Sequence, residues 1–474
     1  MIKNESKKNE NKKWYRKMPH SYILLFMIII LVTVLTYVIP AGEFGREEVN
    51  GRLVVVANSF SYTEQNPVGL FDMFQAIPAG MVAAANIVFI VFFASAFFKV
   101  IDSTGALENG IGVGVRKIRS KETSSTVLIW VVTFVFGLLG AVVGFENNIA
   151  IVPIGILVSL ALGYDLMVGA AMTIGGIGLG FATSPINPYT VGVAHEIAEL
   201  PVFSGFGLRT LYCLSSMAVL AFSISKYAKK IEANPSSSLV ADVDTKGLNL
   251  SKNMEDYSMT GTHKAVIAVL LGTIGIIIFG TLKYKWYLQE ITTVFFIGSI
   301  VVGIVSKMNP NDFVKIMIQG ASEVTSGALI VGVARAISII LSSGNISDTI
   351  IYSLSMPLQN LPTMVSAVLM SLVHGIINFV IPSGSGQAMA TMPIMIPLGD
   401  LLNMTRQTAT LAFQIGDGIT NLLYPTLGGL MAMLAVSRVP FDRWFKFIFP
   451  VVLKVTVAGW IYTIIGVAIN WGPF

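Results

Sequence analysis

Charged side chains are scarce in this sequence. They make up 12% of its 474 residues, against roughly 25% in an average soluble domain, whereas hydrophobic residues make up 54%. This balance excludes an ordinary water-soluble protein, because too few polar side chains remain to cover its surface. Apolar runs long enough to cross a bilayer core of about 30 Å recur from Ser21–Ile39 to Phe447–Ile469. The sequence therefore predicts an all-α, polytopic membrane protein.

Cysteine and the common catalytic motifs are equally scarce. Cys213 is the single cysteine, so no intrachain disulfide can form. The sequence contains no His/Cys metal-ligand cluster, no Gly-x-Ser-x-Gly elbow and no phosphate-binding loop. Asp165 and Asp417 leave an intramembrane aspartyl protease as an alternative, but Gln414 stands where the Gly-x-Gly-Asp motif of such enzymes requires glycine. We therefore expect that the protein is not an enzyme and needs no metal or other cofactor.

The basic residues that are present gather in short polar segments between the apolar runs. Lipid-flanking segments rich in Lys and Arg mark the cytoplasmic side of a membrane protein. We therefore expect a multi-pass protein of the cell inner membrane with a cytoplasmic N-terminus and a first span that is retained, and no nucleic-acid partner. The basic segments are Lys12–Lys17, Arg116–Lys121, Lys226–Lys230 and Arg438–Lys446.

These segments divide the chain into two membrane halves. We expect a cytoplasmic tail over 1–20, a first half over 21–230, a cytoplasmic linker over 231–263 and a second half over 264–474. Each half is expected to contain a helical hairpin, at about 126–163 and 363–402, followed by a broken helix, at about 166–198 and 405–437. Further single spans are expected at Ala79–Ile101, Ala265–Leu282, Ile291–Val305 and Thr325–Leu341.

The two halves are related by an internal repeat. The positive-inside rule makes the first repeat unit enter from the cytoplasm and the second from outside, so the repeat is expected to have inverted topology. Inverted repeats with helices interrupted by Gly and Pro are typical of secondary transporters, whose site lies where the halves meet. One ungapped offset aligns Gly144 with Gly384, Pro153 with Pro393, Gly176 with Gly416, Gly178 with Gly418 and Pro185 with Pro425.

Two stretches rich in Pro and Gly interrupt the broken helices, "ATSPINPYT" and "IGDGITNLLYPTLGG". Proline removes a backbone donor, and glycine tolerates positive φ and close approach of a ligand. Non-helical backbone at membrane depth persists only where it is buried in protein or lines a wet cavity. These stretches are therefore predicted to form part of a central site.

Four segments together resemble the anaerobic four-carbon dicarboxylate carrier family, and in particular its YfcC-type branch, whose label is basic amino acid antiporter. They are "GFENNIAIVPIG", "SPINPYTVGVAHE", "NFVIPSGSGQAMATMPIMIP" and "QIGDGITNLLYPT". The wider ion transporter superfamily, to which this family is similar, has two re-entrant hairpins and two unwound helices in an elevator-like transport domain. The resemblance implies hairpin tips at Glu146–Asn148 and Ser383–Gln387, breaks at Ser184–Asn187 and Asp417–Pro425, coupling to Na⁺ or H⁺, and a homodimer.

Glu146 and Asp417 are the strongest candidate site residues. An ionised carboxylate at the centre of a membrane helix costs about 2.5–3.5 kcal/mol, so such residues are presumed functional, although a structural capping role is the alternative. Arg335, which could instead pair with Asp417, and His374, which could be a buried core residue, are secondary candidates. The neutral candidates, which could equally hold helices together, are Asn147, Asn148, Ser184, Asn187, Ser383, Ser385, Gln387 and Asn421, with Gly384 and Gly386 for backbone approach.

These residues predict a secondary active transporter, either an antiporter or an ion-coupled symporter. Two acidic candidates favour a substrate that carries positive charge, such as arginine exchanged for ornithine. A four-carbon dicarboxylate is the alternative substrate, for which Arg335 and the helix N-termini at the breaks would supply positive charge.

Overall fold

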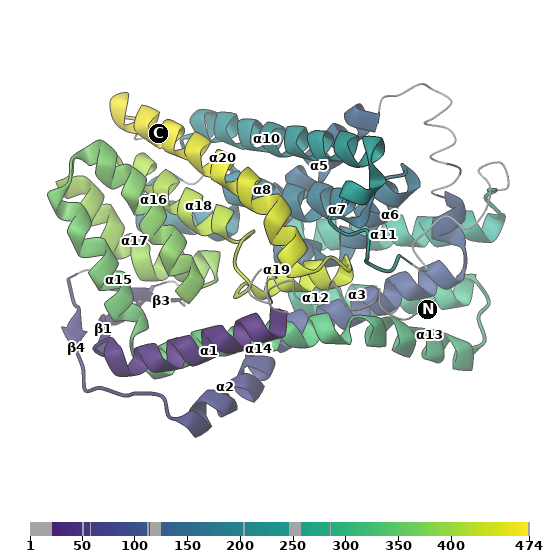
Figure 1. Cartoon of the computed structure of the whole chain (residues 1–474), viewed down its shortest axis with the longest axis horizontal. Coiled ribbons are helices and arrows are strands. Elements are labelled where there is room, and N and C mark those ends of the chain that lie inside the picture. The colour runs from purple at the N-terminus through teal and green to yellow at the C-terminus, as the bar shows by residue number, and fades with distance from the viewer. Residues whose placement is uncertain are drawn as a thin grey trace, which may run out of the picture.

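The computed structural model describes residues 21–49, 52–56, 58–110, 113, 125–201, 204–245, 257–284 and 286–472. These ranges are almost entirely helical (Figure 1). The expected cytoplasmic tail and the basic segment Arg116–Lys121 lie outside the described residues. Within them, seven helices are long and apolar enough to span a membrane, and the bent pair Pro310–Glu323 and Ala328–Ser343 makes an eighth. This number of apolar helices is that of a multi-pass membrane protein.

Helix α1 (Ser21–Val38) leads into a short segment of β-structure. The all-α prediction holds for most of the described chain, and these short strands are an addition that it did not include. Arg46 forms an ion pair with Asp348 at 2.8 Å, which fixes the segment against the second half of the chain. The strands pair antiparallel as β1 (Gly42–Glu43) with β4 (Ser61–Tyr62) and as β2 (Arg46–Val49) with β3 (Arg52–Val55).

Two expected single spans prove to belong to pairs of consecutive helices. The span expected at Ala79–Ile101 is α2 (Leu70–Ala83) followed by α3 (Ala85–Ser103). The span expected at Thr325–Leu341 is preceded by a further helix, so that α13 (Pro310–Glu323) joins α14 (Thr325–Ser343) at a bend of 44°. Neither joint contains Gly or Pro, so the sequence carried no breaker signal for them.

These helices cross-pair between the two halves. Helix α2 packs against α14, and α3 packs against α13. Gly80 permits the first contact, because a Cβ atom there would lie 2.3 Å from the backbone oxygen of Gly332. Helix α1 also packs on α14, and α12 (Leu288–Val305) packs on α3.

Each half then contains a helical hairpin and a broken helix. In the first half, the 3₁₀ turn Glu146–Ile151 joins the two arms of the hairpin, and the broken helix is interrupted at residues 184–187. Its elements are α5 (Ser125–Val143), α6 (Val152–Ala161), α7 (Leu166–Ala170), the π-helical turn Ala171–Gly175, α8 (Gly176–Thr183), the π-helical turn Pro188–Gly192, α9 (Val193–Ile197) and α10 (Phe206–Ala233).

The second half repeats this order of elements, with one correction to the expected bounds. The break expected at Asp417–Pro425 begins later, because α18 continues through Asp417 to Thr420. The tip implied at Ser383–Gln387 lies at the start of the second hairpin arm, where Ser383 is the N-cap residue of α17 and Gly384–Gln387 form its first turn. The elements are α11 (Gly261–Tyr284), α15 (Ser347–Ser355), α16 (Thr363–Val380), α17 (Gly384–Leu401), α18 (Arg406–Thr420), α19 (Gly428–Val436) and α20 (Phe441–Ala468), with a 3₁₀ turn at Met356–Asn360. A further 3₁₀ turn, Pro235–Ser237, lies in the expected linker between the halves.

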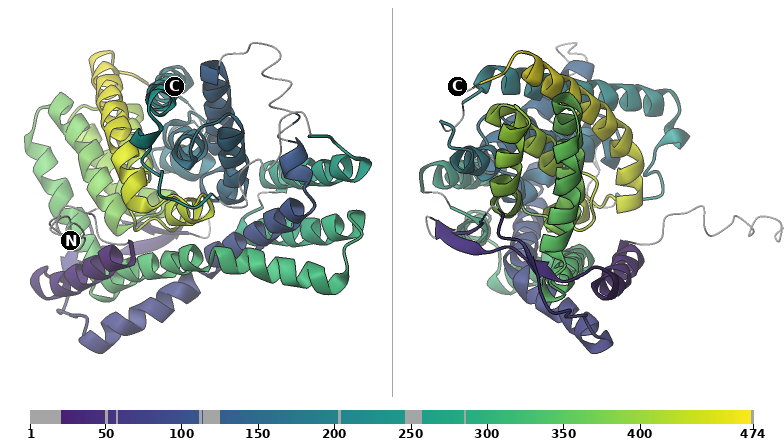
Figure 2. Two further views of the ribbon diagram at one scale, coloured as in Figure 1. Left: turned by 45° about the vertical axis from the view of Figure 1, so that its right-hand side comes forward. Right: turned by 90° about the vertical axis from the view of Figure 1, so that its left-hand side faces the viewer.

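The broken helices form the centre of the molecule. Helix α5 packs against α8, α16 packs against α18, and α8 packs against α18. A Cβ atom on Gly418 would lie 2.6 Å from Cα of Ala182, so glycine allows the two broken helices to meet backbone to backbone. The segment Leu166–Thr183 is completely buried. Figure 2 shows α10 and α20 covering this centre on one side, with α1, α2 and α14 on the other.

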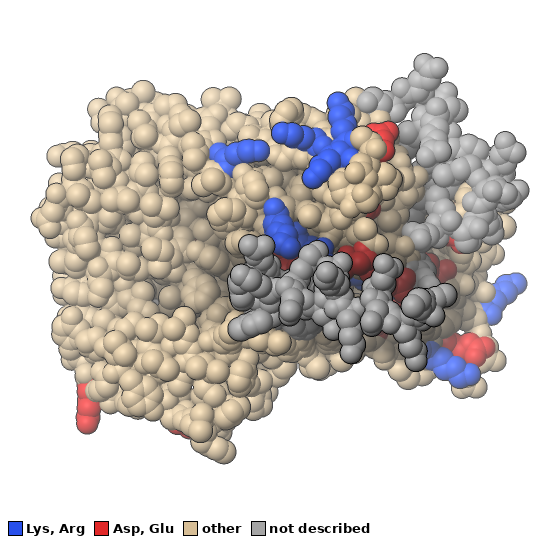
Figure 3. All heavy atoms as spheres, viewed as in Figure 1, with Lys and Arg blue, Asp and Glu red and all other residues tan. Residues whose placement is uncertain are grey.

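Charged side chains are unevenly distributed over the surface. Figure 3 shows that on the visible face they gather toward the end of the molecule at which α10 ends and α20 begins, while the opposite end is largely uncharged. The basic residues of these two helix ends are Lys226, Lys229, Lys230, Arg443 and Lys446.

Candidate functional site

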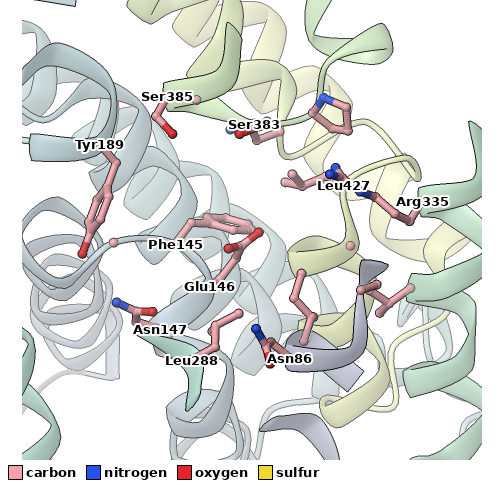
Figure 4. Close-up of a pocket in the computed structure, with 18 of the residues that line it drawn as sticks. Asn86, Phe145, Glu146, Asn147, Tyr189, Leu288, Arg335, Ser383, Ser385 and Leu427 are labelled. Atoms are coloured by element: carbon pink, nitrogen blue, oxygen red, sulfur yellow. The ribbon is translucent and has the colours of Figure 1, made fainter. Parts of the chain in front are cut away.

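A cavity of about 290 Å³ lies at the centre, where elements from both halves meet. This volume is at the lower end of the range of about 300–1,000 Å³ that is typical of small-molecule sites. Its walls come from both hairpins, both broken helices, the joint between α2 and α3, α14 and the start of α12 (Figure 4). The site residues expected from the sequence that line it are Glu146, Asn147, Ser383, Gly384, Ser385, Asn421 and Arg335.

Glu146 reaches the cavity from the turn of the first hairpin. Gly144 precedes it with a φ of +108°, a conformation that other residues rarely adopt, and this turn directs the chain back into the protein. The hydroxyl group of Tyr287, just before α12, donates a 2.6 Å hydrogen bond to Oε2 of Glu146. Among the described residues, Oε1 has no hydrogen-bond partner. Sequence reasoning missed Tyr287, because nothing in the pattern brings the α11–α12 loop to the hairpin.

Arg335 reaches the same cavity from α14. Its side chain is exposed although Ala334 and Ala336 on either side are fully buried. It takes part in none of the ion pairs or hydrogen bonds found among the described residues, and thus does not pair with Asp417. Figure 4 shows Arg335 and Glu146 directed into one space from different elements. The cavity therefore contains one unpaired cation and one carboxylate with a free oxygen.

The second hairpin presents the beginning of α17 to the cavity. Ser383 is the N-cap, and its hydroxyl oxygen accepts a 3.3 Å hydrogen bond from the backbone N–H of Gly386. Ser385 follows in the first turn and lines the cavity. The first N–H groups of a helix lack intrahelical acceptors and carry partial positive charge, so this wall favours the negative end of a ligand.

Asp417 does not line the cavity but lies directly behind its wall. The side chain is fully buried, and neither carboxylate oxygen has a hydrogen-bond partner among the described residues. A Cβ atom placed on Gly384 would lie 3.4 Å from Oδ2 of Asp417 and 2.5 Å from Cγ2 of Thr190. The hairpin glycine thus separates a buried, unsatisfied carboxylate from the cavity.

Three of the expected site residues stabilise the turn of the first hairpin or the break of the first half and do not line the cavity. Asn148 donates to the backbone oxygens of Gly144 and Leu139. The hydroxyl group of Ser184 accepts from the N–H of Ile186, and Asn187 accepts from the N–H groups of two following residues, Tyr189 and Thr190. These hydrogen bonds replace the backbone hydrogen bonds that are lost where helices end, so the three side chains have a structural role in this conformation. Their role as substrate ligands stays a prediction.

Gln387, Gly386 and His374 also lie away from the cavity. Gln387 and His374 are fully buried, and Nε2 of Gln387 donates a 2.9 Å hydrogen bond to the backbone oxygen of His374. Gly386 supplies the N–H that caps α17 on Ser383. These residues join the two arms of the second hairpin, and a role in binding substrate stays a prediction for them as well.

Sequence reasoning missed a buried arginine between the broken helices. Arg209 of α10 is fully buried, and the described contacts of its guanidinium group include no carboxylate. It donates to Oε1 of Gln414 at 2.7 Å and to Oε1 of Gln407 at 3.0 Å, with the ring of Trp471 5.0 Å away. The sequence did contain a signal for this residue, since Arg209 lies within the apolar run of α10. Charged residues inside membrane segments are rare and usually have a role.

Two relatives match almost the whole chain. The chain is 32% identical over 470 residues to a protein of Escherichia coli K12 named "Putative basic amino acid antiporter YfcC", with 90% of this chain and 92% of that protein covered. It is 27% identical over 501 residues to an uncharacterised protein of Haemophilus influenzae, with 95% of this chain and 97% of that protein covered.

Solved structures of similar proteins include the efflux pump MtrF of Neisseria gonorrhoeae and the transporter YdaH of Alcanivorax borkumensis. MtrF is 16% identical with a TM-score of 0.43, and the match covers 95% of this chain and 96% of MtrF. YdaH is 15% identical with a TM-score of 0.42, and the match covers 96% of this chain and 99% of YdaH.

The family comparison covers residues 18–468, which match the C4-dicarboxylate anaerobic carriers. The proteins of this family are named as carriers and the Escherichia coli relative as an antiporter, so the alternative of an intramembrane protease is set aside. This agrees with the number of apolar helices and with a central cavity of small-molecule size. The chain belongs to the C4-dicarboxylate anaerobic carrier family and is a multi-pass membrane transporter, not an enzyme.

Proposed function

We propose that the protein is an antiporter that exchanges basic amino acids, with arginine and ornithine as the leading pair. The observation that carries this proposal is the charge around the cavity. Glu146 lines it and Asp417 lies behind Gly384, so two carboxylates lie at or next to a cavity that is also lined by one guanidinium group, that of Arg335. A site with one excess negative charge is complementary to a substrate with one net positive charge, which compensates the cost of burying both. The label of the Escherichia coli relative points the same way.

Asp417 is proposed as the group that couples binding to transport. A buried carboxylate without donors is stable only if it is neutralised by a proton or by a nearby cation. Substrate, Na⁺ or H⁺ could each neutralise this carboxylate. Because Gly384 has no side chain, a cation in the cavity can come close to Asp417 at this position. Exchange follows if the hairpins move only while this charge is compensated.

Inverted repeats and an elevator-like movement are part of the same proposal. The recurrence of hairpin, broken helix and long helix in both halves supports the repeat. The hairpins and broken helices would move as a transport domain relative to the cross-paired helices α2, α3, α13 and α14. An inner-membrane location with a cytoplasmic N-terminus is supported by the basic segments Lys226–Lys230 and Arg438–Lys446. A homodimer is proposed from the family resemblance alone.

A four-carbon dicarboxylate remains the second candidate substrate. Arg335 is unpaired in the cavity, and the N-terminus of α17 opens onto it, so two anion-binding features are present. The name of the family also favours it. Against it, a dianion would bring the total negative charge around Glu146 to a level that Arg335 alone cannot balance.

Counterflow in proteoliposomes separates the two substrates. Vesicles containing the full-length protein are preloaded in turn with arginine, ornithine, succinate or fumarate, and uptake of the matching labelled solute is followed. We expect internal arginine or ornithine to drive uptake and the dicarboxylates to leave it at the level of empty vesicles. Uptake driven only by succinate or fumarate would reverse the assignment of substrate charge.

A further inference from the structure

Glu146 and Arg335 have opposite charges and line one cavity, and they interact through their charges without forming an ion pair within 4.0 Å. Glu146 is partly buried and Arg335 is exposed at the cavity, so a ligand that replaces water there must supply a counter-charge for each. Arg335 has no ion pair among the described residues, and Glu146 keeps Oε1 free while Tyr287 occupies Oε2. A ligand that carries both signs of charge could therefore enter the cavity and neutralise both side chains.

We propose that this pair is a clamp for the head group of an α-amino acid, with the α-carboxylate on Arg335 and the α-ammonium group on Glu146. The inference rests on the proposed function and extends it from net charge to the orientation of the substrate. A guanidinium group donates two parallel hydrogen bonds to a carboxylate, which makes Arg335 selective for planar carboxylates over other anions. The side chain of the substrate then extends toward the wall formed by Gly384.

The wall around the clamp agrees with this orientation. Ser383 and Ser385 offer hydroxyl groups at the start of α17, and Asn147 and Asn421 offer amides. Behind Gly384 lie the free oxygens of Asp417 and the hydroxyl group of Thr190, which has no hydrogen-bond partner among the described residues. The N-terminus of α17 carries a partial positive charge of about half an elementary charge, which the full negative charge of an ionised Asp417 exceeds. A positively charged side chain directed there would therefore be attracted, whereas a carboxylate would be repelled by Asp417.

The two parts of the clamp come from different parts of the fold. Arg335 belongs to α14, which packs against α2 and α1, whereas Glu146 belongs to the turn of the first hairpin. A ligand held by both therefore bridges the hairpin to the cross-paired helices. Binding of the amino acid head group would in this way affect the first hairpin and the cross-paired helices at the same time.

The test compares arginine with two analogues that each lack one head-group charge. Agmatine lacks the α-carboxylate, and δ-guanidinovalerate lacks the α-ammonium group. Their inhibition of labelled arginine counterflow is measured in proteoliposomes, with labelled agmatine as a second transported solute. In the unaltered protein we expect inhibition constants for both analogues about 10- to 100-fold above that of arginine, the loss expected for one charged hydrogen-bonding group.

Variants then assign each charge to its residue. Arg335→Gln should raise the inhibition constant of arginine to that of agmatine and leave agmatine unchanged, with Arg335→Lys intermediate. Glu146→Gln should remove the difference between arginine and δ-guanidinovalerate. Lys315→Gln is the matched control, because Lys315 is exposed on α13 and its one ion pair within the described part of the chain is with Asp312, one helical turn away.

The possible failures are distinguishable. If the unaltered protein transports arginine but does not distinguish it from agmatine, the clamp is wrong and the proposed function stands. Equal losses for arginine and agmatine in both Arg335 variants would mean a structural role, and would also overturn the clamp. Counterflow of dicarboxylates alone would overturn the proposed function together with the clamp. Gel filtration in detergent checks that each variant is folded. The comparison of arginine with its two analogues in the unaltered protein tests the clamp even if a variant fails to fold.

Discussion

Gln414 of α18 donates a 2.7 Å hydrogen bond from Nε2 to the backbone oxygen of Ser184, at the break of the first half. The same glutamine accepts from Arg209 through Oε1. A carbonyl group released by a helix break must find a donor at membrane depth, and here the donor comes from the broken helix of the other half. One side chain thus joins the break of the first half to the broken helix of the second half, and it is itself held by a buried arginine.

Replacing this glutamine should destabilise the protein and slow exchange. Gln414→Leu leaves the backbone oxygen of Ser184 and one donor of Arg209 unpaired, each at a cost of about 1–3 kcal/mol. We expect a clear fall in the unfolding temperature in detergent and a reduced maximal rate of counterflow. Gln359→Leu, at an exposed position of a 3₁₀ turn, should stay within about 0.5 kcal/mol of the unaltered protein. Equal behaviour of the two variants would contradict the role of Gln414.

Asp417→Asn should separate stability from transport. The neutral amide has nearly the shape of the carboxylate but is less costly to bury without a charged partner, so the unfolding temperature should be unchanged or higher. Transport should fall by at least about tenfold, because the charge that senses the substrate is lost. Thermal unfolding in detergent and counterflow measure the two effects. A loss of stability in parallel with transport would indicate a purely structural carboxylate.

Gly384→Ala tests the thin wall between the cavity and Asp417. The added Cβ would lie 2.5 Å from Cγ2 of Thr190, so the first turn of α17 must shift away. We expect transport to be strongly impaired, although alanine by itself favours a helix by about 1 kcal/mol over glycine. Gly272→Ala is the control, because nothing lies within 4 Å of its added Cβ and only the gain in helix propensity remains. Normal counterflow in Gly384→Ala would show that the close approach is dispensable.

Tyr287→Phe should weaken substrate binding more than turnover. It removes the hydrogen bond that orients Glu146, and a bond to a charged group contributes about 1.5–3 kcal/mol. We expect the KM for arginine to rise roughly tenfold with little change in the maximal rate. Tyr284→Phe, at the last residue of α11, is a nearby control, because its hydroxyl group has no hydrogen bond among the described residues. A changed maximal rate with constant KM would instead assign Tyr287 to the movement of the hairpin.

The central cavity could be located from the sequence only in part. Glu146 and Arg335 could be selected as candidates because each is a charged residue within an apolar run, a pattern that can be seen without knowing the fold. Asn148, Ser184 and Asn187 have the same local signature, yet they bond to the backbone of their own breaks. Composition cannot distinguish a polar side chain that faces a ligand from one that replaces a lost helical hydrogen bond, because both are required where a membrane helix ends.

The sequence by itself determined that the chain is a membrane protein and that its apolar runs are interrupted by polar stretches rich in Pro and Gly. Those properties follow from local hydropathy and from Pro and Gly, which act on the backbone regardless of distant contacts. Only the tertiary structure decided that Tyr287 meets Glu146, that Arg335 shares their cavity and that Asp417 stays behind Gly384. It also decided the unmarked joints after Ala83 and Glu323. These depend on packing between residues far apart in the chain, for which no local pattern exists.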